Sequence, residues 1–294
     1  MVSTWSAREV SQPGGGATTH DFIVFIDTGA PAIALRKVAL ASLAKQFRAH
    51  LITFDTNQEL LLADGRNAGE AFEFSGYQWG LEEALRASLA RSGDVLRILF
   101  LNGTAFTSHL PLSPRLFLSQ AFGEPTSDGP PRLRGLVQSC GVPTRAVATR
   151  GFYLPTFALH LAGKAEDVAR LRFYDPSALG TRALAARYAS AGHDYDRMVT
   201  EWLSPTSPFR GWYKATPGQP LDEVTAYRKR VAIYLEHSLP GWMERQGVNV
   251  SMEPLIPRLA QIGGYMLADR VFVNLLKIRF RVGRYLRGTP ASRA

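Results

Sequence analysis

The sequence predicts an α/β fold in which a mainly parallel, twisted sheet is flanked by helices and followed by a helical C-terminal region. Apolar runs at 22–26, 50–54 and 97–101 each end in polar residues, which is typical of buried parallel strands. Between these runs, apolar residues recur at helical spacing over 33–47 and over 76–90. Strands that alternate with helices form parallel sheets, so the order of the elements indicates the fold class.

The first strand, helix and strand form a βαβ unit, and polar residues follow each of its strands. The first strand ends at Asp27 and Thr28, and the second ends at Asp55 and Asn57. In open parallel sheets, ligands bind outside the carboxyl ends of the strands, so these four residues are candidate ligand contacts. Asp and Asn are also ordinary turn residues, which is the structural alternative at the same positions.

Candidate binding residues continue in the segment that leads into the next helix. Asn67 and Gly69 precede the helical pattern, and glycine lets the backbone come close to a ligand such as a diphosphate. A simple loop turn explains the same two residues. Tyr77 lies at the start of the helical pattern, where it would either contact a ligand or pack in the core.

The rest of the chain is expected to complete the sheet and then to become helical. The expected elements are a strand at 133–139, a short aromatic element from 151, and helices at 164–190, 194–202 and 221–245. Residues 1–19 read as a loose tail, because they have no apolar central region of the kind found in secretion signals. Without internal repeats or long linkers, residues 20–294 are predicted to form a single domain.

The composition of the chain limits the cellular compartments and the binding partners that it fits. The 294 residues include 34 Lys and Arg, 25 Asp and Glu and one cysteine, with a net charge of +9. The lone Cys140 excludes a disulfide framework and a multi-cysteine zinc site, and it fits a reducing cytoplasm. No nucleic-acid partner is expected, because the basic residues are not interleaved with aromatic ones as in known reader motifs.

A basic, amphipathic segment covers about 268–290. Its charges are too frequent for a transmembrane helix, which needs about twenty nearly uncharged residues. The segment is either an interfacial helix on an anionic membrane or a C-terminal helix that packs on its own domain with its basic residues outward.

Short motifs over residues 21–285 occur in the order found in a known group of enzymes. They are the strand end at 51–57, Asn67-x-Gly69, Gly76-Tyr77-x-x-Gly80, the strand end at 99–104, the aromatic element at 151–154 and the late helical segment at 234–248. In this order the chain resembles bacterial polysaccharide-building glycosyltransferases of the GT-A kind, particularly the rhamnan synthesis protein F family. Each motif is short, so their order carries the resemblance.

The resemblance implies a GT-A-like domain that moves a sugar, such as rhamnose or another deoxyhexose, from a TDP-, GDP- or UDP-sugar donor. The acceptor would be a cell-surface polysaccharide or a lipid-linked glycan, and the enzyme would be cytoplasmic, on the inner membrane surface if the acceptor is lipid-linked. Asn102 and Thr104, at the end of the third strand, would contact the sugar nucleotide. The candidate contacts at the first two strand ends would border its base and ribose.

One residue departs from the family's pattern. Gly103 stands where the family has an Asp, a carboxylate that commonly helps Mg²⁺ or Mn²⁺ to bridge the diphosphate. Glycine has no side chain that can ligate a cation. The enzyme would then be metal-independent, use another acid, or be inactive, and no metal ligand is assigned. Arg132, Arg134 and Lys214 are candidates to neutralise the diphosphate instead.

The candidate catalytic residues are Glu236 and His237. A transferase that inverts the anomeric carbon needs a carboxylate or an imidazole to take the proton of the acceptor hydroxyl. Apolar residues precede Glu236 and would raise its pKa by desolvation, whereas a solvated helix face is the alternative. Asp194 and Asp196, with His193, would either bind a metal or form a solvent-facing helix N-terminus.

Two other function classes stay open at this point. A catalytically inactive GT-A-like module that binds glycan or protein is favoured by Gly103, and it would bind the donor without turnover. A basic nucleic-acid-binding protein would instead show an affinity that falls steeply with salt.

Overall fold

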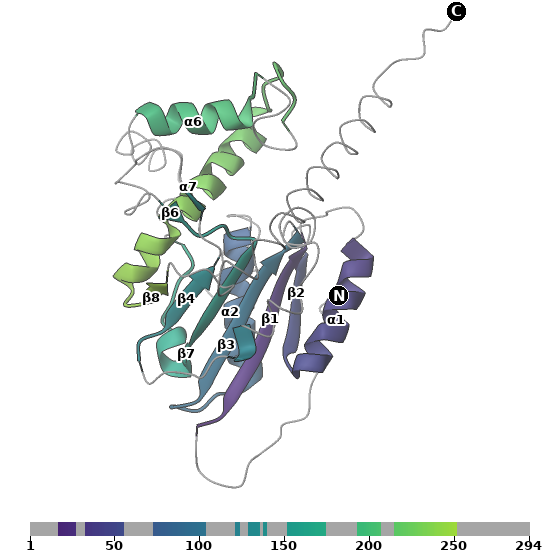
Figure 1. Cartoon of the computed structure of the whole chain (residues 1–294), viewed down its shortest axis with the longest axis vertical. Coiled ribbons are helices and arrows are strands. Elements are labelled where there is room, and N and C mark those ends of the chain that lie inside the picture. Colours follow the sequence, from purple (N-terminus) through teal and green to yellow (C-terminus); the bar gives the residue numbers. More distant parts are fainter. Residues whose placement is uncertain are drawn as a thin grey trace, which may run out of the picture.

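The computed structural model of the chain describes residues 17–27, 33–55, 73–103, 121–123, 129–135, 138–139, 152–174, 193–206 and 215–251. These residues form a six-stranded sheet in the order β2-β1-β3-β7-β4-β8, with helices packed on it (Figure 1). The elements are β1 (Thr19–Asp27), α1 (Ile33–Phe47), β2 (His50–Asp55), α2 (Glu73–Ser88), β3 (Val95–Asn102), β4 (Arg132–Gly135), β5 (Gln138–Ser139), β6 (Phe152–Tyr153), β7 (Ala158–Lys164), α4 (Ala165–Val168), α6 (His193–Leu203), α7 (Glu223–Arg245) and β8 (Asn249–Ser251).

The large sheet is mixed but mostly parallel. β1 runs parallel to both β2 and β3, and β4 runs parallel to β8. β7 lies between β3 and β4 and is antiparallel to both. The predicted α/β class, with a mainly parallel sheet flanked by helices, is therefore confirmed.

Two expected elements differ from the structure. The strand expected at 133–139 is divided between β4 and β5, which belong to different sheets. The helix expected from residue 164 begins at Ala165, and α4 ends at Val168, directly after β7. The sequence does not indicate β7 because its residues, Ala-Leu-His-Leu-Ala-Gly-Lys, include no β-branched side chain. Its pairing with two neighbouring strands decides its structure.

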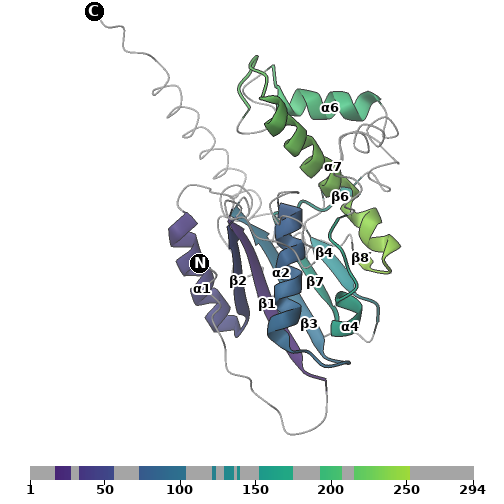
Figure 2. The same cartoon turned by 180° about the vertical axis from the view of Figure 1, so that it is seen from behind.

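Apolar layers cover both faces of the sheet. α2 packs on one face and α1 on the other, and the residues of β1 alternate between the two layers (Figure 2). Val24, for example, belongs to the α2 layer, and Phe25 belongs to the α1 layer. α2 comes very close to β1, since a Cβ atom on Gly76 would stand 2.8 Å from Cδ1 of Ile26. The missing side chain is what allows this contact.

The helical part predicted beyond the sheet consists of α6 and α7. Their bounds confirm the helices expected at 194–202 and 221–245. Asp222 caps α7, because its carboxylate accepts a hydrogen bond of 2.9 Å from the Thr225 amide. No helix in the described ranges is long and apolar enough to cross a membrane.

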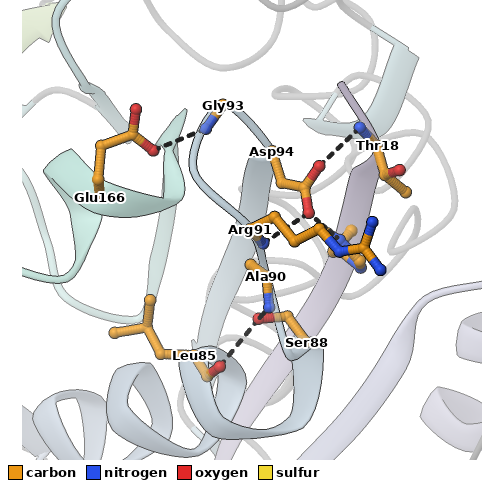
Figure 3. Close-up of polar contacts among 9 residues, drawn as sticks. Thr18, Leu85, Ser88, Ala90, Arg91, Gly93, Asp94 and Glu166 are labelled. Atoms are coloured by element: carbon orange, nitrogen blue, oxygen red, sulfur yellow. Dashed lines mark hydrogen bonds and ion pairs between the residues drawn. The ribbon is translucent and has the colours of Figure 1, made fainter. Parts of the chain in front are cut away.

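Side-chain carboxylates accept hydrogen bonds from backbone amides around the turn between α2 and β3, at the amino-terminal edge of the sheet (Figure 3). The Asp94 carboxylate accepts from the amides of Arg91, at 2.8 Å, and Thr18, at 2.9 Å. The Glu166 carboxylate accepts from the Gly93 amide at 3.1 Å. The amides of Arg91 and Thr18 lower the pKa of Asp94. The amide of Gly93 lowers the pKa of Glu166 in the same way. The charged carboxylates therefore serve as anchors for the turn.

Candidate functional site

The first three strands bring their polar ends to one edge of the sheet. Asp27 lies opposite Asp55 in the β1–β2 register, and Asn102 lies opposite Ile26 in the β1–β3 register. Asp27 and Asn102 are buried and Asp55 is partly exposed. The register thus places these three predicted residues together at the carboxyl edge.

These three residues do not share a face of the sheet. Asp27 follows Phe25 by two positions and so faces the α1 layer, together with Asp55. Asn102 shares the register position of Ile26, which belongs to the α2 layer. The candidate residues therefore divide into an aspartate pair on the α1 side and Asn102 on the α2 side.

Several predicted residues lie outside the described ranges. They are Thr28, Asn57, Asn67, Gly69 and Thr104 among the ligand contacts, Lys214 among the basic residues, Cys140, and the segment at 268–290. Their predicted roles stay predictions.

The residue at the centre of the α2 side is Thr156, in the loop that leads into β7. Its amide donates to Oε1 of Glu236 at 2.8 Å. Its hydroxyl lies 3.0 Å from Oε1 of Glu73 and 3.2 Å from Oε1 of Glu236. Its carbonyl accepts a hydrogen bond from the hydroxyl of Tyr77. All three polar groups of one threonine are thus engaged, and they join α2, β7 and α7.

The carboxyls of Glu73 and Glu236, which we call the carboxyl pair, are joined through Thr156 and lie at the same edge as Asn102. Because β7 is antiparallel to β3, the start of β7 meets the end of β3. The amide of Asn102 donates to the carbonyl of Phe157, the residue after Thr156, at 3.3 Å. The predicted base and the predicted sugar-nucleotide contact are thus close neighbours.

Glu236 has the electrostatics expected of a proton-transfer group. Its pKa is raised to about 7, first by burial and then by the charge of Glu73. The Thr156 amide and the charge of Lys229 act in the opposite direction. The residue as a whole is partly exposed. A carboxyl with this pKa exists in both protonation states near neutral pH.

Tyr77 does not occupy the position predicted for it. The side chain has no exposed surface, and its ring packs against Phe100, at 5.1 Å between centroids, and Phe173, at 5.8 Å. Its hydroxyl is bonded to Thr156. The prediction of a direct ligand contact is therefore replaced by a positioning role, in which Tyr77 holds the loop that carries Thr156.

His237 also occupies a different environment from Glu236. It is buried, and its Nδ1 lies 2.9 Å from the hydroxyl of Tyr195, while its ring is 4.3 Å from that of Tyr153. Burial lowers its pKa to about 4, so the imidazole is neutral at physiological pH. This placement favours a structural role for His237, joining α6 to α7 and β6, over the predicted catalytic role.

The described residues do not supply a metal site at the end of β3. Gly103 is buried there and offers no side-chain ligand, and within the described ranges no group of three or more His, Cys, Asp or Glu could hold a metal. Asp194 and Asp196 are exposed and lie 2.9 Å from Arg197 and 2.6 Å from Arg230, respectively. These two aspartates therefore form a solvent-facing helix start, the second of the two alternatives.

Two of the predicted basic residues lie away from the carboxyl pair. Arg132 and Arg134 alternate with Leu133, a member of the α2 layer, and therefore face the α1 side. Arg134 stands opposite His160 in the β4–β7 register. Burial, followed by the charges of Arg134 and Arg97, lowers the pKa of His160 to about 3. A phosphate held by these arginines would lie on the side of Asp27 and Asp55.

No protein-family model, curated protein or solved structure matches the chain. The resemblance to the rhamnan synthesis protein F family therefore remains a prediction based on the order of short motifs. What the structure establishes is an α/β fold with a mixed, mostly parallel sheet and a carboxyl pair at the carboxyl edge.

Sequence reasoning missed Glu73 and Thr156. Glu73 is the first residue of α2, where an acidic residue is already explained by its favourable interaction with the helix dipole. Thr156 follows the predicted aromatic element at 151–154 by two residues. Its position close to this element could have marked Thr156 as a candidate, because functional residues concentrate in loops held by a rigid scaffold.

Proposed function

We propose that the protein is a glycosyltransferase with a GT-A-like fold. It would move a sugar, such as rhamnose or another deoxyhexose, from a nucleotide-diphosphate donor to a cell-surface polysaccharide or a lipid-linked acceptor. The proposal is supported by the motif order, by the mostly parallel sheet, and by polar strand ends that share an edge with a candidate base.

The observation that carries the proposal is Glu236, a residue at the carboxyl edge whose carboxyl is hydrogen-bonded to Thr156 and has a pKa raised to about 7. As a carboxylate it would accept the proton of the acceptor hydroxyl. The freed oxygen would form a bond to the anomeric carbon while the bond from that carbon to the diphosphate oxygen breaks. A single displacement of this kind inverts the anomeric centre. The diphosphate leaves with the electron pair of the broken bond.

The donor would lie along the strand ends. Asn102 is the neighbour of the carboxyl pair and would hydrogen-bond the donor near the reacting sugar. Asp27 and Asp55, on the other side of the edge, would border the nucleoside. No metal ligand is assigned, because Gly103 stands where the resembled family has a carboxylate.

The first experiment is a thermal-stability screen with TDP, UDP, GDP and CDP, each with Mg²⁺, Mn²⁺ or EDTA. A ligand at one hundred times its dissociation constant stabilises a protein by about 2.7 kcal/mol, which a melting curve resolves. Stabilisation by one nucleotide supports the donor site and identifies its base. Absence of any shift contradicts the proposal.

A second candidate function is a non-catalytic GT-A-like module that binds glycan or protein. The observation that favours it is Gly103, where the family carries a carboxylate. The two functions are separated by incubation with the nucleotide sugar that stabilises the protein. Release of nucleoside diphosphate in the presence of an acceptor supports the transferase, and binding without release supports the module.

A further inference from the structure

We propose that Glu73 is a functional partner of Glu236, and that the two carboxyls hold one proton between them through the hydroxyl of Thr156. This inference rests on the proposed function, in which Glu236 is the base. Glu73 would be a positioning residue, because it acts on Glu236 and not on the substrate.

The Thr156 hydroxyl has more carboxyl neighbours than it has hydrogens to donate. The Thr156 hydroxyl has a single hydrogen, yet its oxygen lies within hydrogen-bond distance of both Glu73, at 3.0 Å, and Glu236, at 3.2 Å. The hydroxyl can donate to one carboxyl only. The second contact becomes a hydrogen bond when the other carboxyl is protonated and donates to the hydroxyl oxygen. One proton on the pair therefore lets both contacts of the Thr156 hydroxyl be hydrogen bonds.

The surroundings decide which carboxyl carries the proton. Glu73 is the first residue of α2, and the positive end of a helix dipole stabilises a carboxylate there. Glu236 lies in the middle of α7, against the buried side chain of Tyr77, with Lys229 as the positive group that acts on it. Burial, followed by the charge of Glu73, raises the pKa of Glu236, so Glu236 is the carboxyl of the pair that carries the proton.

This arrangement assigns a task to each group during transfer. Glu236 must first lose its proton to water, and the resulting carboxylate then takes the proton of the acceptor hydroxyl. The charge of Glu73 opposes that loss, so it makes Glu236 a stronger base once ionised. The Thr156 hydroxyl donates to whichever carboxyl is charged. The proton taken from the acceptor leaves the carboxyl pair in its original state.

The test follows the titration of Glu236 in the full-length protein by NMR of ¹³C-labelled glutamate carboxyls, with Glu236→Gln to identify the signal. In Glu73→Gln we expect the midpoint of Glu236 to fall by about one pH unit or more, the size that marks coupled carboxyls. Glu223→Gln is the matched control, since Glu223 is an exposed glutamate in the first turn of α7, the helix that carries Glu236. An unchanged midpoint in Glu73→Gln overturns the proposal.

Two variants of Thr156 test the link through the hydroxyl. Thr156→Val removes the hydroxyl at nearly constant volume, and Thr156→Ser keeps it. We expect the midpoint to move in the valine variant and to return in the serine variant. Equal midpoints in both variants would exclude a role for the hydroxyl.

Kinetics separate this inference from the proposed function. With transfer established, the acidic limb of the kcat/KM profile moves to lower pH in Glu73→Gln, by the same amount as the NMR midpoint. If no nucleotide sugar is turned over, the proposed function fails. The NMR midpoints still decide whether the two carboxyls share a proton.

Discussion

At each edge of the sheet a glutamate carboxylate accepts a hydrogen bond from a backbone amide, but the pKa values of the two glutamates shift in opposite directions. At the amino edge, Glu166 accepts from the Gly93 amide at 3.1 Å, and at the carboxyl edge Glu236 accepts from the Thr156 amide at 2.8 Å. The pKa of Glu166 is lowered, whereas that of Glu236 is raised to about 7. A hydrogen bond to a backbone amide therefore does not determine the protonation of a carboxyl.

The surroundings account for the difference. Glu166 is solvated and has the positive charges of Lys164 and Arg170 nearby, which favour the carboxylate. Glu236 is desolvated and has the negative charge of Glu73 nearby, which disfavours it. The surroundings at the amino edge keep Glu166 charged, and those at the carboxyl edge bring the pKa of Glu236 close to neutral pH. Only the second arrangement suits proton transfer.

The largest effect that would break this comparison is the loss of transfer in Glu236→Gln. Gln cannot accept a proton, so we expect the transfer rate to fall by about 10²–10⁴-fold with the fold unchanged. Initial rates and circular dichroism measure the two properties, and Glu223→Gln should keep the rate. A rate near wild type in Glu236→Gln would show that the base lies elsewhere.

The sign of the pH dependence of stability sharpens the comparison. The pKa of Glu236 is above its ordinary value of 4.5, so between pH 4.5 and about 7 the native state binds more protons than the unfolded state. Glu236 therefore lowers the free energy of unfolding as the pH rises through this window. Urea denaturation at pH 5 to 8 should show Glu236→Gln gaining stability relative to wild type as the pH rises.

Asp94 should show the opposite sign. Its folded pKa is below the ordinary value of 3.8, so its contribution to stability is present above pH 3.8 and is lost as the pH falls further. Asp94→Asn should therefore reduce the acid dependence of unfolding that Glu236→Gln leaves in place. Equal pH profiles for the two variants would remove the distinction between the edges.

Gly80→Ala tests the helix that connects the edges. A Cβ atom at Gly80 would run into the side chain of Val24, which is β-branched and buried. We expect a loss of about 1–3 kcal/mol in the free energy of unfolding, since α2 must move away from β1. Gly123→Ala is the control, because a Cβ atom there meets nothing within 4 Å. Two melting curves that shift equally would contradict the close packing of α2.

The smallest effect is expected at the amino edge. Asp94→Ala removes the acceptor of the Arg91 and Thr18 amides and should cost about 1 kcal/mol of stability. Nucleotide binding and the titration of Glu236 should not change. Asp167→Ala, which removes a surface ion pair with Arg170, should alter stability by less than about 0.5 kcal/mol.

The sequence predicts the fold better than it predicts the site. The strands that became β1, β2 and β3 have β-rich apolar runs with polar ends, and their register confirms that Asp27, Asp55 and Asn102 share one edge. β7 escaped prediction because its side chains fit a helix as well as a strand. Once the two apolar layers are known, the alternation of side chains along each strand also gives the face on which each of these polar residues lies.

The carboxyl pair could not be predicted in the same way. Thr156 is 83 residues from Glu73 and 80 residues from Glu236 along the chain. Only tertiary packing brings them together, and no local pattern records it. The prediction for Tyr77 failed for a related reason, since an aromatic residue at a helix start fits a ligand site and a buried core equally well.

The position of α7 near the end of the described chain has a consequence for synthesis on the ribosome. Glu73 and Thr156 emerge early and can reach their places when β3 and β7 pair. Glu236 follows only when nearly all of the described chain has been made. Since a domain generally folds as a unit, the carboxyl pair is complete only after α7 has been made. Under the proposed function, a nascent or prematurely ended chain would thus lack its candidate base, Glu236.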